Sequence, residues 1–401
     1  MRKMSTISFA GNFPDSSPLQ SYGRAFSSRH QIDENFYVEV VDSVSGLLGY
    51  LEDWHQLISF CSISNAFYEP YFLLTALQSL HHNPKLRFIF VYRQNTNFDS
   101  AHELCGFFPL ESAQIEKYPR SGWKLITNSL SFSCDPLIRA GFENEVILSF
   151  IKWSKAAHCS IIELPCVSAE GAFQSSLNFV LKELSITPFI LKTSRRSCLK
   201  RDSAVWDGRN IRRDVNRKRR RLAEQGQLEF RVLKSLHQLA DWQKGFLSLE
   251  ERGWKGQKGT ALNQNPSQRS FFMTATRQAF ERNKFQMLGL FLDEKPIAFK
   301  CNLISGKNGY AWKIAFDEDY ARYSPGLLLE YDFIDFFKNQ TELNVIDSCA
   351  TPGHPLFARI WPDQLSRQTI FVPTGMLLSK MYCSTRPLMR SLKRKLLAKP
   401  T

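Results

Sequence analysis

The stretch Gly309–Tyr331 constrains the fold of this chain more than any other part of it. Its apolar beginning is typical of a β-strand, a polar loop follows, and a Pro325-Gly326 step leads directly into an apolar helical segment. A helix that begins at glycine presents free backbone N–H groups and the positive end of its dipole, with no side chain over them. The sequence therefore predicts a strand–loop–helix unit that suits a pyrophosphate or another anion at the start of the helix.

The elements expected around this unit follow a regular order. A basic amphipathic helix, in which Ile211, Val215 and Leu222 share one apolar face, opens the second half of the chain. After it we expect helices at Ser235–Glu250 and Gln268–Asn283, strands at Phe285–Leu292, Pro296–Ser305 and Tyr310–Phe316, a helix at Gly326–Lys338 and a strand at Asn344–Asp347. The first half shows a looser version of the same order. The pattern predicts an α/β (α+β) fold of two tandem lobes, each a mixed, mostly antiparallel sheet flanked by helices.

The 401 residues exceed one ordinary domain, and the basic residues are concentrated in two places. Twelve basic and three acidic residues fall between Arg195 and Arg221, and six basic residues with no acidic one fall between Arg386 and Lys399. From these shifts we predict a disordered leader at 1–35, a first lobe at 36–192, a basic linker at 193–210, a second lobe at 211–380 and a basic tail at 381–401.

Cysteine usage and hydropathy narrow the class of protein. The nine cysteines are scattered and form no CxxC pair, which favours a reducing compartment and argues against a structural zinc site. No run of residues reaches the ~18 apolar residues that a membrane span requires. We expect a soluble, cytoplasmic protein without a metal.

Three motifs resemble the GNAT-type acetyltransferases, in particular the two-lobed FemAB and CelD-like proteins. They are the basic helix near Arg212–Arg221, the glycine-rich segment Glu250–Leu262 with its Gly253-Trp254-Lys255-Gly256 sequence, and the strand–loop–helix unit. The resemblance covers roughly residues 36 to 375. It implies a GNAT-like fold for both lobes and transfer of an acyl group, most simply acetyl from acetyl-CoA, to an amine or a hydroxyl. The implied acceptor is a polysaccharide or cell-envelope precursor.

The resemblance also implies where the acyl donor lies. Pantetheine is expected along Trp312, Lys313, Ile314 and Ala315, and the pyrophosphate over Arg322, Ser324, Gly326 and Leu327. The usual donor signature, an arginine or glutamine followed by two spaced glycines, is incomplete, because Arg322 is followed by a single glycine. The residues expected to contact the acceptor are Trp254, Lys255 and Tyr323.

Acyl transfer to an amine needs a base that takes the amine proton. Asp347 and His354, at and after the end of a predicted strand, are the candidates, and histidine titrates near neutral pH. Alternatives remain for both: His354 as the cap of a following helix, and Asp347 as a carboxylate bonded to nearby backbone N–H groups. Cys349 is expected to pack rather than react. FemAB relatives often use a lysine near this loop, where Arg359 stands here, so a lysine mechanism is not carried over.

Two other readings of the basic segments stay open. A FemAB-like aminoacyl transferase would take its donor from charged tRNA, and the basic helix would bind that RNA. A non-catalytic protein would use the helix and the tail Met389–Leu397 as an adaptor at an anionic surface, with weak peripheral membrane contact and no stable insertion.

Overall fold

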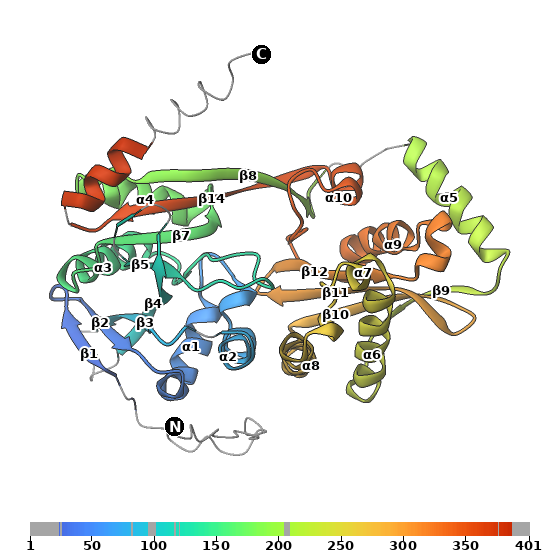
Figure 1. The fold of residues 1–401 in the computed structure, drawn as a ribbon, viewed down its shortest axis with the longest axis horizontal. Helices are drawn as coiled ribbons and strands as arrows, with labels where there is room; N and C mark the ends of the chain where they lie inside the picture. The colour runs from blue at the N-terminus through green and yellow to red at the C-terminus, as the bar shows by residue number, and fades with distance from the viewer. Residues whose placement is uncertain are drawn as a thin grey trace, which may run out of the picture.

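The computed structural model describes residues 24, 26–81, 83–94, 102–115, 118–119, 121–203, 209–375 and 377–386. The two halves of the chain lie side by side, and strands at the top of the view run between them (Figure 1). They share one 14-stranded sheet with the order β1-β2-β3-β4-β5-β7-β14-β8-β13-β12-β11-β10-β9, and β6 pairs with β4 off this path.

The first half contains a meander between helices. Its elements are β1 (Ser28–Gln31), β2 (Phe36–Val41), η1 (Ser45–Tyr50), α1 (Leu51–Ser59), η2 (Ala66–Tyr68), α2 (Pro70–Ser79), β3 (Leu86–Gln94), β4 (His102–Gln114), β5 (Ser121–Leu125), β6 (Leu137–Ile138), α3 (Glu143–Ala156), β7 (Ile161–Ser168), α4 (Gly171–Glu183) and β8 (Phe189–Lys200). Strands β2 to β5 pair antiparallel in sequence order, and β5 pairs with β7 in parallel.

The second half repeats this order more regularly. Its elements are α5 (Arg209–Ala223), β9 (Leu228–Val232), α6 (Leu236–Arg252), α7 (Trp254–Gln257), η3 (Leu262–Gln264), α8 (Pro266–Glu281), β10 (Phe285–Leu292), β11 (Lys295–Ser305), β12 (Asn308–Phe316), η4 (Glu318–Tyr323), α9 (Pro325–Gln340), β13 (Val345–Asp347), α10 (Pro355–Ile360) and β14 (Asp363–Pro373). Strands β9 to β12 pair antiparallel, and β12 pairs with β13 in parallel. The predicted mixed, mostly antiparallel fold of two similar lobes is confirmed.

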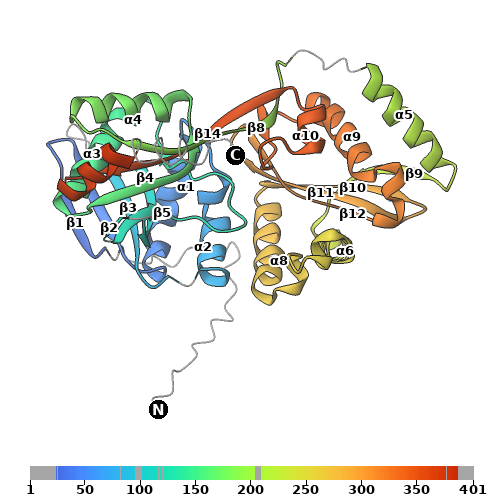
Figure 2. The same ribbon diagram turned by 45° about the horizontal axis from the view of Figure 1, so that its top comes forward.

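The halves exchange their last strands. By the order of elements β8 would close the first sheet and β14 the second, yet β14 pairs with β7 and β8 pairs with β13. The two exchanged strands also pair with each other, and they cross between the halves in both views (Figures 1 and 2). This exchange makes one continuous sheet of the two lobes.

An aromatic cluster also joins the halves. Phe72 on α2 lies 5.0 Å from Phe271 on α8 and 5.9 Å from Trp312 on β12, measured between ring centroids. The indole N–H of Trp312 donates to the carbonyl of Leu130 at 2.9 Å. Because these contacts are buried, the wall of β12 is held from both halves.

Three predicted segments need correction or lie outside the description. Residues 28–31 of the predicted leader form β1, which pairs with β2, and Arg29 bonds Glu39 there. The start of the predicted linker is strand β8, because its polar residues find partners on β13 and β14. Residues 377–386 are helical, and the basic tail beyond them lies outside the described residues. Within the described ranges, the helices are too short or too polar to span a lipid bilayer.

Candidate active site

A cavity of about 710 Å³ lies in the second half, where β12 and β13 part. The two strands pair only between Asn308–Tyr310 and Val345–Asp347, and β12 then continues to Phe316 while β13 has ended. The walls are the end of β12, the start of α9, the α6–α7 turn, the segment after β13, and Phe132 from the first half. The parted strands therefore leave a space open to both sides of the sheet.

The start of α9 forms one end of this cavity. Ser324, with a left-handed φ of 53°, turns the chain into the helix, and its side chain makes no capping bond to the helix. A Cβ added at Gly326 would lie 3.4 Å from Phe316, which is an ordinary van der Waals distance, and the helical backbone there suits any residue. Packing therefore does not require glycine at this position. Pro325 has no N–H, and the N–H groups of Leu327 and Leu328 donate to the carbonyl of Ser324 at 2.9 and 3.1 Å. The N–H of Gly326 is therefore the first-turn donor left for an anion in the described part of the chain.

The basic helix α5 lies beside this helix start. The Nζ of Lys218 donates to Oγ of Ser324 at 2.8 Å and lies 3.5 Å from Asp214. Arg219 forms an ion pair with Asp332 of α9 at 2.5 Å. These contacts bring a positive charge to the N-terminus of α9.

Two lysines and a glutamate line the α6 side of the cavity. Glu250 accepts from Nζ of Lys255 at 2.6 Å and from the backbone N–H of Leu262 at 2.9 Å. Burial and the nearby charge of Lys255 lower the pKa of Lys313 to about 8. Trp254, 49% exposed, covers the rim beside them.

A buried ion pair lies on the α9 side. Lys300 on β11 donates to Glu330 on α9 at 2.6 Å, and both side chains are buried. The ammonium also lies over the rings of Phe333, Phe357 and Trp361, at 4.5, 5.6 and 5.2 Å from their centroids. Burial lowers the pKa of Lys300 and raises that of Glu330, because both charged forms lose their hydration.

His354 lies at the far wall of the cavity. It occupies the N-cap position of α10, yet its side chain makes no capping bond. Its Nδ1 is buried without a hydrogen-bond partner among the described residues, and its ring lies 5.2 Å from Phe357. Burial lowers the pKa of His354, so the imidazole is mostly neutral near pH 7.

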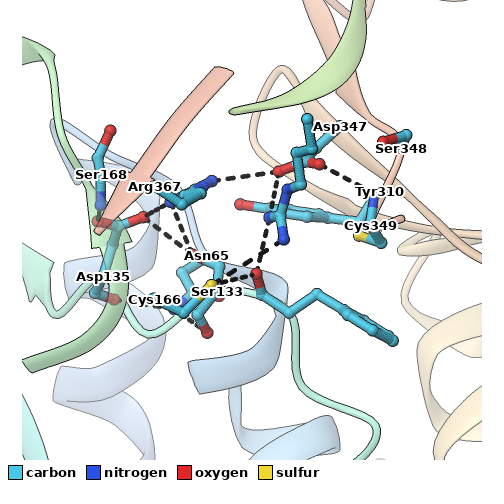
Figure 3. A network of polar contacts seen from close by, with 12 residues as sticks. Asn65, Ser133, Asp135, Cys166, Ser168, Tyr310, Asp347, Ser348, Cys349 and Arg367 are labelled. Carbon is cyan, nitrogen blue, oxygen red and sulfur yellow. Dashed lines mark hydrogen bonds and ion pairs between the residues drawn. The ribbon is translucent and has the colours of Figure 1, made fainter. Parts of the chain in front are cut away.

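Asp347 lies in a buried charged network rather than in the cavity wall (Figure 3). It forms ion pairs with Arg196 at 2.5 Å and Arg367 at 3.3 Å, and Arg367 also bonds Asp135 of the first half. Its Oδ1 accepts the backbone N–H of Cys349 at 2.9 Å. Burial opposes ionisation, but the two arginines prevail and lower the pKa of Asp347.

This network connects the exchanged strands to the cavity. Arg196 is on β8, Arg367 is on β14, and Arg196 also donates to the carbonyl of the lining residue Phe132 at 2.7 Å. A carboxylate held in this way is a poor proton acceptor. Asp347 instead fits the alternative of a carboxylate bonded to backbone, and it positions the segment that leads to His354.

Ten of the predicted site residues meet at the cavity: Trp254, Lys255, Trp312, Lys313, Ile314, Ala315, Ser324, Gly326, Leu327 and His354. Asp347, Arg322 and Tyr323 are not part of its wall; Arg322 is exposed and stacks over the buried Tyr323 at 4.7 Å. Sequence reasoning missed Glu250, Lys300 and Phe132. A lysine within the otherwise apolar run Ile297–Cys301 was a usable signal for Lys300, whereas nothing local marks Phe132.

The comparisons with known proteins agree with this geometry. Residues 209–351 match the family described as the acetyltransferase (GNAT) domain. A conserved protein of unknown function from Bacteroides thetaiotaomicron has a TM-score of 0.52 at 10% identity, over 80% of this chain and 97% of that one. FemX has a TM-score of 0.51 at 9% identity, over 80% of this chain and 95% of its own. No curated protein matches the sequence.

The matched residues and the element order define a fold of the GNAT type. The whole chain has a GNAT-type, FemAB-like fold, and residues 209–351 match the GNAT acetyltransferase domain. The domain match supports acyl transfer in general.

Proposed function

We propose that this protein transfers an acyl group, in the simplest case acetyl, from acyl-CoA to an amine or a hydroxyl group in the cavity between β12 and β13. The observation that carries this proposal is the uncapped start of α9 at the end of a 710 Å³ cavity between parted strands. The pyrophosphate of coenzyme A would bind the backbone N–H of Gly326 at the positive end of the helix dipole, with Lys218 beside it. The free thiols of all nine cysteines agree with a cytoplasmic location.

The chemistry would take place along the open edge of β12. Beyond Tyr310 that edge no longer pairs with β13, so its backbone N–H groups are available to a thioester carbonyl. The acceptor nitrogen or oxygen attacks the carbonyl carbon, its new bond replaces the carbon–sulfur bond, and the sulfur of coenzyme A leaves as a thiolate, which can take the proton held by His354. In this mechanism the neutral His354 takes the acceptor proton, directly or through a water molecule.

Ligand-dependent unfolding tests the donor site. Coenzyme A or acetyl-CoA at about 100 times its dissociation constant should raise the free energy of unfolding by about 2.7 kcal/mol, measured by thermal denaturation. Gly326→Val should abolish this increase, because the branched side chain covers the helix start. Gly326→Ala is the matched control, since one methyl group fits beside Phe316, and it should give an intermediate effect. Equal stabilisation of the wild type and Gly326→Val would reject the site.

A second candidate activity is aminoacyl transfer from charged tRNA. The observation in its favour is the outer face of α5, where Arg212, Arg213, Arg220 and Arg221 are exposed. Replacing the cations of Arg217–Arg221 with glutamine should then abolish tRNA binding in a filter-binding assay at low salt. If the unmodified protein shows no affinity for tRNA under these conditions, this candidate is excluded. In either case a polysaccharide or cell-envelope precursor remains our proposed acceptor.

A further inference from the structure

Lys313 is a cation in the cavity wall without a counter-ion. No carboxylate of the described residues lies within ion-pair distance of its Nζ, and its side chain is only partly exposed. The charged or titratable groups that face it are Lys255, Glu250 and Cys301, and of these Lys255 repels it. The α6 side of the cavity therefore holds two ammonium groups and one carboxylate.

The carboxylates in this part of the wall are already engaged. Both oxygens of Glu250 accept hydrogen bonds, one from Lys255 and one from the backbone N–H of Leu262. Glu318, at the rim, accepts from the backbone N–H of Trp254 at 2.6 Å. Neither carboxylate forms an ion pair with Lys313, so among the described residues its ammonium group is left without a direct partner in the cavity wall.

We propose that the acceptor carries a carboxylate or phosphate group that binds Lys313, with Lys255 and Trp254 beside it. This inference rests on the proposed acyl transfer, because it assigns the α6 side of the same cavity to the acceptor. The donor's phosphates lie at the start of α9, on the other side of the sheet from α6. An anionic ligand would supply the missing counter-ion and offset the cost of burying the ammonium group.

The position of Lys313 on β12 gives the anion a second role. The anchor lies on the same strand whose open edge would hold the thioester carbonyl. Binding the anionic end of the acceptor would therefore orient its nucleophile toward that edge. A neutral analogue of the acceptor would lack this anchor and would bind more weakly.

Sulfate and acetate are the probes for this site, since sulfate stands for a phosphate ester and keeps its charge from pH 6.5 to 9.5. Binding is measured by isothermal titration calorimetry at constant ionic strength, with saturating coenzyme A to occupy the start of α9. Lys313→Met should weaken binding roughly tenfold or more, the size expected for a charge-assisted hydrogen bond. Lys313→Arg should keep it, and Lys244→Met, an exposed lysine of α6 outside the cavity wall, should change it less than about twofold.

The pH dependence separates anion binding from a purely structural role of Lys313. In the wild type, sulfate affinity should fall as pH rises through about 8, where Lys313 loses its proton. In Lys313→Arg this fall should vanish, because arginine stays charged. Tight acetate binding with weak sulfate binding would identify a carboxylate acceptor, and the reverse a phosphate.

Failure of this inference can be told apart from failure of the proposed function. If coenzyme A binds but sulfate and acetate affinities are the same in the wild type and Lys313→Met, the anionic acceptor is rejected and the donor site stands. If coenzyme A does not bind, the anion titrations are repeated in Gly326→Val. Binding that still depends on Lys313 then supports the anion site and rejects the proposed donor.

Discussion

The two halves use the same order of elements to build opposite interiors. In the first half, Phe108 on β4 stacks on Phe150 of α3 with a centroid distance of 4.0 Å, and the void beside this stack is about 10 Å³. In the second half the corresponding strand and helix, β11 and α9, carry Lys300 and Glu330 and border a cavity of about 710 Å³. The contact between β4 and α3 is apolar and nearly filled, whereas that between β11 and α9 contains an ion pair beside a cavity.

The first turns of the corresponding helices α3 and α9 also differ in charge. The first turn of α3 contains Glu143 and Glu145, whose charges favour the helix but repel an anionic ligand. The first turn of α9 has no acidic residue and opens with Pro325 and Gly326. Elements that correspond in their order along the chain therefore carry different side chains, acidic at the start of α3 and non-acidic at the start of α9.

The largest expected effect concerns the ion pair of Lys300 and Glu330 between β11 and α9. The corresponding elements of the first half, β4 and α3, are joined by the stacked phenylalanines instead. Glu330→Gln leaves the buried Lys300 without its counter-charge and should lower the free energy of unfolding by about 3–5 kcal/mol, measured by urea denaturation. The double variant Lys300→Met/Glu330→Leu copies the apolar character of the first half and should cost far less, or even stabilise the protein. If both variants lose the same free energy of unfolding, an apolar pair cannot take the place of the ion pair in the second half.

A second prediction concerns the segments after β7 and β13. The former reads Ser168-Ala-Glu-Gly171 and contains no histidine, whereas the latter leads to His354. His354→Ala should lower kcat at least about a hundredfold while coenzyme A binding is kept, as expected for loss of a general base. Because burial lowers the pKa of His354 below its ordinary value of about 6.5, wild-type activity should persist at pH 6.5 and fall as pH drops through that lowered pKa.

The matched control for this prediction is His237→Ala, an exposed histidine on α6. Its kcat and its pH profile should equal those of the wild type in a thiol-release assay. An unchanged acid limb in His354→Ala would assign the proton transfer to another group.

Local sequence patterns were sufficient for the regular elements of the second half. The strand Phe285–Leu292 was predicted with its observed bounds, and the helix after Pro325 differs by one or two residues at its ends. Apolar residues recur in these segments with the period of a strand or of a helix, so each segment alone contains the pattern that predicts its secondary structure. The Pro-Gly step likewise located one end of the cavity.

Long-range pairing was not visible in the same way. Strand β8 reads as a basic linker because Arg196 finds its counter-charge on Asp347, 151 residues further along the chain. The exchange of β8 and β14 depends on pairings across the two halves, which no local period encodes. The same reason explains why the sequence leaves Asp347 open between a base and a carboxylate bonded to backbone: its two arginine partners come from β8 and β14, both distant in sequence.

The smallest expected effect concerns Lys218, the cation that α5 brings to the start of α9. The corresponding helix of the first half, α3, instead has two glutamates in its first turn. Lys218→Met removes the bond to Ser324 and should weaken coenzyme A binding only about threefold, because a partly exposed, solvent-screened charge contributes less than about 1 kcal/mol. The difference should shrink as ionic strength rises, since salt screens this attraction. Calorimetric titration of Arg221→Met provides the comparison, because this exposed arginine lies on the same helix and makes no hydrogen bond or ion pair to Ser324 or α9 within the described residues. An equal loss in both variants would mean that α5 acts through its overall charge, and a loss confined to Lys218→Met would place that lysine at the donor's phosphates.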